Sequence, residues 1–96
     1  MTDAAFVAAL DDLANLLRSC NQIDRAKWTE ERRALASGAS GDKLAEVKKE
    51  VRAVLAGMGS LSDLYLVPES GSGIDEAEAR RRQFDLVDRL DELTAH

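Results

Sequence analysis

The chain has 96 residues, of which 45% are hydrophobic and 32% are charged, and its formal net charge is −5. This composition is too apolar for a disordered chain, and no apolar run approaches the length of a membrane span. The acidic balance opposes binding to nucleic acid, because phosphate contacts depend on lysine and arginine. We therefore expect one soluble domain over residues 1–96 that has neither a nucleic-acid nor a membrane partner.

The N-terminal residues lack a basic leader and a small-residue cleavage site, so we expect no signal peptide. The single cysteine, Cys20, cannot form an internal disulfide, which fits a reducing compartment. No second thiol or cluster of histidines accompanies it, so we expect neither a metal nor a cofactor. These features together predict a cytoplasmic protein.

The first predicted helix runs from Asp3 to about Cys20. Its apolar residues recur every three or four positions and so form one stripe: Phe6, Leu10, Leu13, Leu17 and Cys20. Thr2 or Asp3 can cap its start, and Asn21 can end it in the left-handed conformation. Because Cys20 lies on the stripe, we expect a buried thiol rather than a reactive one.

A second, weaker helix is predicted from about Asp24 to Ser37. Trp28 and Leu35 lie seven residues apart and share a face of this helix, but the apolar stripe that they form is thin. We therefore expect the helix to pack at the edge of the fold. Two glycines and two serines between Ser37 and Gly41 then favour a turn.

The third helix is predicted to begin near Asp42 and to end at Gly57. Its expected core residues are Leu44, Val47, Val51, Val54 and Leu55. The last helix is predicted to start after a cap at Asp75 and to continue to about Thr94. Its expected buried residues are Phe84, Leu86, Val87, Leu90 and Leu93.

The basic run of the last helix, residues 80–82, is flanked by acidic residues. Residues four apart are neighbours on a helix, so we expect ion pairs between Glu76 and Arg80 and between Glu78 and Arg82. Such pairs indicate a solvated helix face rather than a phosphate-binding patch.

These elements predict an all-α fold: a compact bundle of about four helices with a glycine-rich loop between the third and last helices. Residues 69–73 supply that loop. The first and last helices are expected to pair in a coiled-coil-like seam, either within one chain or between two. A chain this short buries a modest core, so a homodimer is one of the alternatives that we consider.

The segment from Gly57 to Val67 reads Gly-Met-Gly-Ser-Leu-Ser-Asp-Leu-Tyr-Leu-Val. The amphipathic pattern of a packed helix does not by itself explain this choice of residues. In a purely architectural interpretation, Gly57 ends the third helix and Ser60 with Asp63 caps a short turn. The leucines of the segment then reach the core: Leu61, Leu64 and Leu66.

Two functional interpretations of this segment remain beside the architectural one. In the first, the backbone amides around Gly57, Gly59 and Ser60 form an anion site, although the lysine of a nucleotide-binding phosphate loop is absent. In the second, the segment is an exposed contact for another protein, because a thioether, an aromatic ring and a carboxylate occur close together. The residues of this partner-binding set are Met58, Leu61, Asp63 and Tyr65.

Residues 13–19, Trp28 and the segment from Gly57 to Leu64 resemble a family of small bacterial proteins of unknown function. Members of that family carry a Gly-Gly-Met-Gly-Ser-Leu-Asn-Asp-Leu type signature. The resemblance covers roughly residues 10–68, and it departs at Ala56, where the family has glycine, and at Ser62, where it has asparagine. It implies a compact helical cytoplasmic protein of bacterial origin, and it supplies no activity.

Catalysis by a nucleophile would need a serine or cysteine beside a base, and the only histidine is the terminal residue, His96. Adjacent carboxylates on a helix point about 100° apart and do not converge on one ion. We therefore expect a non-catalytic protein that binds another protein, favouring a basic one, as a toxin-neutralising protein or an accessory subunit. The alternatives are a small-molecule or anion-binding protein and a structural homodimer.

Overall fold

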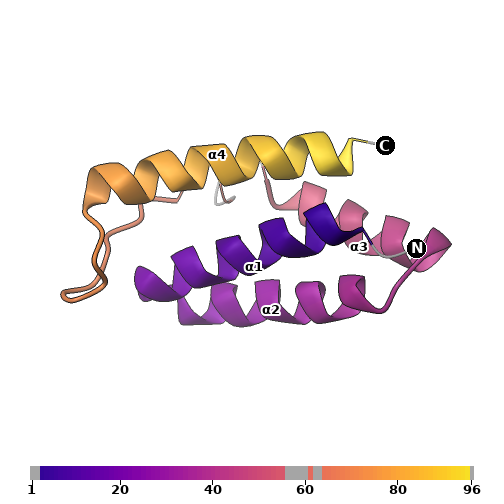
Figure 1. The fold of residues 1–96 in the computed structure, drawn as a ribbon, viewed down its shortest axis with the longest axis horizontal. Coiled ribbons are helices and arrows are strands. Elements are labelled where there is room, and N and C mark those ends of the chain that lie inside the picture. The colour runs from indigo at the N-terminus through magenta and orange to yellow at the C-terminus, as the bar shows by residue number, and fades with distance from the viewer. Residues whose placement is uncertain (1–2, 56–60, 62–63, 96) are drawn as a thin grey trace.

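The computed structural model describes residues 3–55, 61 and 64–95, which form α-helices and no strand (Figure 1). The helices are α1 (Ala4–Ser19), α2 (Ile23–Ser37), α3 (Gly41–Ala53) and α4 (Glu76–Thr94). Consecutive helices run in alternating directions, and α1 lies between α2 and α4. The predicted all-α bundle is confirmed, and the first and last helices do pair within one chain. Among the described helices, none is long and apolar enough to cross a membrane.

The start of α1 is held by Asp3, as the sequence predicts. Its carboxylate accepts a hydrogen bond from the backbone N–H of Phe6 at 3.1 Å and pairs with Lys48 Nζ of α3 at 2.8 Å. The bond from Lys48, followed by the one from Phe6, lowers the pKa of Asp3. One carboxylate therefore caps α1 and joins it to α3. At the other end of the helix, Asn21 adopts the expected left-handed conformation with φ of 59°.

The apolar stripe of α1 is the centre of the core. The residues predicted for this stripe are all buried: Phe6, Leu10, Leu13, Leu17 and Cys20. Ala9, Ala14 and Leu16 widen the stripe, so that α1 buries side chains toward both α2 and α4. This prediction is confirmed.

The core-facing side of α2 differs from the prediction. Leu35 is 53% exposed and Trp28 is only partly buried, with the guanidinium of Arg32 4.8 Å from its ring centroid. The buried residues are small: Ala26, Thr29 and Ala36. Small side chains let two helix backbones approach closely, so α2 contacts α1 through this face and carries Leu35 outward. Leu35, one of the two residues of the thin stripe expected for this helix, therefore lies outside the core.

Helix α3 ends at Ala53, earlier than the predicted stop at Gly57, which lies outside the described residues. Its predicted core residues are buried or partly buried, as expected. Because α3 is short, it covers only one end of the bundle, and the chain from residue 64 onward runs beside the first half of α4 instead (Figure 1).

Helix α4 starts where the sequence predicts, since Asp75 Oδ1 accepts from the backbone N–H of Glu78 at 2.8 Å. Its buried residues are Ala79, Gln83, Leu86, Leu90 and Thr94. Phe84 is not among them and is 49% exposed. The core stripe passes through Gln83, and the next residue on a helix points about 100° away. The prediction of a buried Phe84 was therefore wrong.

A buried amide fixes the segment before the glycine-rich loop to α4. The side chain of Gln83 is almost fully buried, and its Nε2 donates to the backbone carbonyls of Leu61 at 2.7 Å and Leu64 at 2.8 Å. The side chains of Leu61 and Leu66 are both buried in the core. The amide thereby gives a donor to two backbone carbonyls of the segment between α3 and α4.

We expect Gln83→Ala to lower the free energy of unfolding by about 2 kcal/mol, because it removes the donor from one buried and one partly buried carbonyl. Urea denaturation followed by circular dichroism measures this change. Arg81→Ala on the exposed side of the same helix is the control and should shift stability by less than about 0.5 kcal/mol. Equal unfolding midpoints for the two variants would contradict this role of Gln83.

Candidate functional site

The structure describes only part of the segment that the sequence singles out. Five of the seven predicted site residues lie outside the described residues: Gly57, Met58, Gly59, Ser60 and Asp63. The anion-binding prediction and half of the partner-binding prediction thus stay predictions. Of the other two residues, Leu61 is 4% exposed and Tyr65 is 62% exposed. Leu61 is therefore a core residue and offers no exposed contact, whereas Tyr65 does.

Residues 64–67 form an extended stretch with two distinct sides. Leu64 and Leu66 are partly or fully buried, whereas Tyr65 and Val67 are exposed. Alternation of this kind is typical of extended chain, in which successive side chains point to opposite sides. The backbone N–H of Glu69 donates to the carbonyl of Ser19 at 2.9 Å, so the stretch is also tied to the end of α1.

Tyr65 is held in place by two residues of α4. Its hydroxyl donates to Glu76 Oε2 at 2.8 Å, and the guanidinium of Arg80 lies 5.3 Å from its ring centroid. The predicted pairing of Glu76 with Arg80 is thus replaced by contacts of both residues with Tyr65. The hydrogen bond to Glu76 and the charge of that carboxylate raise the pKa of the Tyr65 hydroxyl. An exposed ring is in this way fixed in one orientation.

Phe84 lies one helical turn after Arg80 on the same side of α4, so the two side chains are neighbours on the surface. We define the Tyr65 surface by four residues: Tyr65, Val67, Arg80 and Phe84. Three of the four large hydrophobic side chains that are exposed among the described residues belong to it, the other being Leu35 on α2. Sequence reasoning identified Tyr65 and missed Phe84, because periodicity assigned the phenylalanine to the core.

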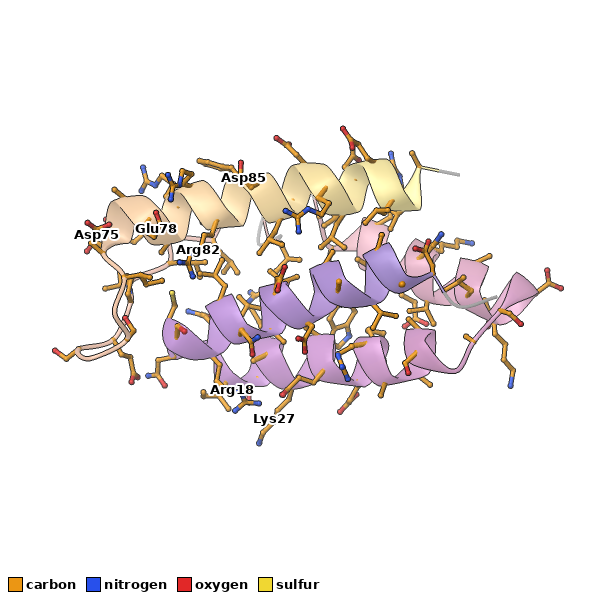
Figure 2. The ribbon with its side chains drawn as sticks, viewed as in Figure 1. Arg18, Lys27, Asp75, Glu78, Arg82 and Asp85 are labelled. Carbon is orange, nitrogen blue, oxygen red and sulfur yellow. The ribbon has the colours of Figure 1, made fainter. Side chains whose placement is uncertain are left out.

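A groove of about 400 Å³ lies on the surface where α1 and α4 meet. Leu16 and Leu86 form its buried floor, and polar residues form its rim: Asp12, Asn15, Ser19, Arg82, Asp85 and Arg89. Figure 2 shows Arg82 reaching from α4 toward α1. Arg89 pairs with Asp12 at 3.5 Å, so basic and acidic side chains on the rim offset one another. This balance gives the groove little attraction for an ion of either sign.

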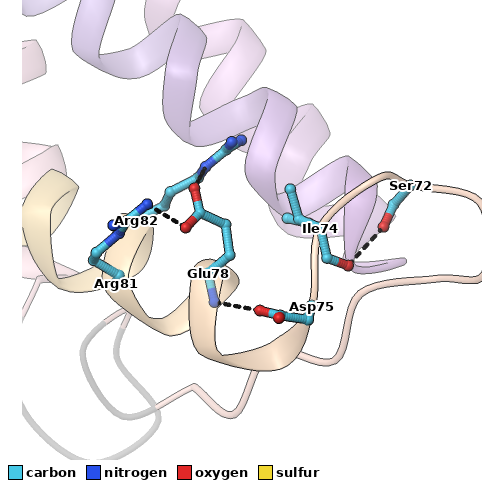
Figure 3. Close-up of polar contacts among 6 residues, drawn as sticks. All are labelled: Ser72, Ile74, Asp75, Glu78, Arg81 and Arg82. Carbon is cyan, nitrogen blue, oxygen red and sulfur yellow. Dashed lines mark hydrogen bonds and ion pairs between the residues drawn. The ribbon is translucent and has the colours of Figure 1, made fainter.

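The arginines at the start of α4 are engaged within the chain. Glu78 accepts from Arg81 and, at 2.9 Å, from Arg82, while Asp75 caps the helix below them (Figure 3). The predicted Glu78–Arg82 pair is confirmed. Of the three consecutive arginines, Arg80 alone makes no ion pair with a described residue, and it lies over Tyr65 instead.

The described residues offer few groups for covalent or metal chemistry. Within residues 3–55, 61 and 64–95, no three histidine, cysteine, aspartate or glutamate side chains are placed to hold a metal ion. Cys20 is buried, as the sequence predicts, and burial raises the pKa of its thiol. The thiol form therefore predominates at neutral pH, and it is shielded from reagents.

Neither a protein-family model, nor a curated protein, nor a solved structure matches the chain. The resemblance to the small bacterial family therefore stays a prediction. The candidate site rests on its own geometry.

Because Tyr65 is the only tyrosine, the ultraviolet absorbance of tyrosinate reports its ionisation alone. We expect Glu76→Gln to lower its pKa toward the ordinary value of about 10, since the carboxylate that opposes ionisation is gone. In the wild type, the raised pKa means that this contact stabilises the fold below the unfolded-state pKa and is lost as pH rises through the folded-state pKa. Glu92→Gln is the control, and an equal shift in both variants would contradict the contact.

Proposed function

We propose that this chain is a non-catalytic protein that binds another protein through the Tyr65 surface. The observation that carries the proposal is an exposed tyrosine held in place on α4. Tyr65 contacts Glu76 and Arg80, Phe84 is exposed one turn beyond Arg80, and Val67 is exposed two residues after Tyr65. Isolated exposed apolar residues are ordinary, whereas contiguous ones mark interaction sites. Burying them against a partner would contribute roughly 25 cal/mol for each Å² removed from water.

The chemistry of the Tyr65 surface also suits recognition of a protein. Tyrosine, phenylalanine and arginine are enriched in the centres of interfaces, where they supply contact area together with polar anchors. The contacts of Tyr65 with Glu76 and Arg80 hold the ring before binding. A side chain that is already ordered loses less conformational entropy when a partner covers it.

The acidic charge of the chain favours a basic partner. The second half of α4 exposes several acidic residues: Asp85, Asp88, Asp91 and Glu92. Together with the net charge of −5, they favour approach of a basic protein and speed association at low ionic strength. A toxin-neutralising protein and an accessory subunit are two roles that such a surface would serve.

The test is affinity capture from a lysate of the organism that encodes the chain, with partners quantified by mass spectrometry. We expect the double variant Tyr65→Ala, Phe84→Ala to lose at least about tenfold of a stoichiometric partner, because truncating two aromatic anchors typically costs more than 1.4 kcal/mol. Leu35→Ala is the matched control, since Leu35 is similarly exposed on α2.

Circular dichroism would establish that each variant is folded. Undiminished capture by the folded double variant would contradict the proposed surface. Equal loss with Leu35→Ala would show that the Tyr65 surface is not the specific contact.

A further inference from the structure

A small pocket lies between the first half of α2 and the end of α3, and its volume is about 270 Å³. Six described residues line it: Asp24, Arg25, Trp28, Thr29, Val54 and Leu61. None of these residues belongs to the Tyr65 surface, and none lines the groove between α1 and α4. The pocket is therefore a separate feature of the molecule, for which the proposed function gives no use.

The interior of the pocket is apolar. Trp28, Val54 and Leu61 supply large hydrophobic side chains, and all three belong to the core or pack against it. The hydroxyl of Thr29 donates to the backbone carbonyl of Arg25 at 2.8 Å, so it already has a partner. An apolar group could thus replace water in the pocket without leaving this hydroxyl unpaired.

Both walls of the pocket are held before any ligand binds. The backbone N–H of Leu61 donates to the carbonyl of Val54 at 2.8 Å, and Gln83 donates to the carbonyl of Leu61. On the opposite wall, the guanidinium of Arg32 lies 4.8 Å from the ring centroid of Trp28. A pocket whose walls are already ordered loses less conformational entropy on binding than one that the ligand must shape.

The rim of the pocket carries two charges of opposite sign. Asp24 is exposed and Arg25 is half-buried, and neither makes an ion pair with the other or with any other residue that the structure describes. Adjacent residues on a helix point about 100° apart, which separates the two charged groups. A carboxylate and a guanidinium therefore remain available beside an apolar interior.

We propose that this pocket binds a free α-amino acid with a large apolar side chain. Such a molecule carries an ammonium and a carboxylate on one carbon atom, so it can pair with Asp24 and Arg25 together while its side chain enters the interior. A carboxylic acid without the ammonium would bring its charge near Asp24 uncompensated, and an amine would do the same near Arg25. The two charges and the apolar lining together select this class of ligand.

The volume of the pocket sets the size of the side chain. A cavity of about 150 Å³ holds benzene, so about 270 Å³ has room for a ring or a branched chain together with part of the amino-acid backbone. The methyl group of alanine would bury little apolar surface, and the free energy gained by burial grows with that area. Leucine and phenylalanine therefore match the pocket better than smaller amino acids.

Trp28 is the only tryptophan of the chain, so its fluorescence reports on the pocket. We expect titration with L-phenylalanine or L-leucine to change this fluorescence with a dissociation constant of about 1 mM or less. L-alanine, 3-phenylpropionate and 2-phenylethylamine lack the large side chain, the ammonium and the carboxylate, respectively. Each should bind at least about fivefold more weakly than L-phenylalanine. Isothermal titration calorimetry measures the same affinities without relying on the ring.

Two variants assign the charges. We expect Asp24→Asn and Arg25→Gln each to weaken the binding of L-phenylalanine at least about threefold. Only Arg25→Gln should weaken 3-phenylpropionate, and only Asp24→Asn should weaken 2-phenylethylamine, because each analogue keeps one charge. Lys27→Gln is the matched control and should leave the affinities unchanged, since Lys27 is exposed on the same helix and does not line the pocket. Circular dichroism would establish that each variant is folded.

If neither L-phenylalanine nor L-leucine binds at concentrations up to about 10 mM by either method, the proposal is overturned. Equal affinity for L-phenylalanine and 3-phenylpropionate would also overturn it, because the ammonium would then have no partner on the protein. Undiminished binding of L-phenylalanine by folded Asp24→Asn and Arg25→Gln would place the ligand elsewhere and overturn the site. None of these results depends on whether the Tyr65 surface binds a protein.

Discussion

The exposed surface of this molecule depends on one buried amide. Gln83 projects from α4 into the core and donates to the carbonyls of Leu61 and Leu64. Leu61 and Leu64 come after α3, which stops at Ala53, and before α4. Because the amide donates to both carbonyls, the extended stretch lies against α4 with its leucines inward. Tyr65 and Val67 must then point outward.

The positions of Glu76 and Arg80 follow from the same contact. Residues four apart on a helix would ordinarily pair with each other. The stretch held by Gln83 brings Tyr65 to both of them, so that Glu76 accepts from its hydroxyl and Arg80 covers its ring. Arg80 is left without a carboxylate among the described residues, which is why the surface combines a fixed aromatic ring with an available cation.

Opposite faces of the helices are used in different ways. The core is built on large residues of α1 and small residues of α2, so that these two helices lie close together. In α4 the core stripe includes Gln83 and Thr94, which satisfy backbone carbonyls, while Phe84 is turned outward. A polar side chain inside is costly unless it is hydrogen-bonded, as both of these are, whereas a single exposed aromatic residue is ordinary. The outward side of α4 is the side that we propose for a partner.

The sequence by itself determined the all-α class, the limits of α1, α2 and α4 to within a residue or two, and the burial of the α1 stripe, because these depend on local periodicity and on caps such as Asp3 and Asp75. It also identified Tyr65 as a candidate contact. Only the tertiary structure decided which residues of α2 face inward, and that the core stripe of α4 passes through Gln83 instead of Phe84. A hydrophobic pattern takes account only of the size and polarity of each residue. In the folded chain, the small residues Ala26 and Ala36 let α2 approach α1 closely, and Gln83 is buried because it donates to two backbone carbonyls. Leu35 and Phe84 are therefore exposed, for reasons that lie in residues distant along the chain.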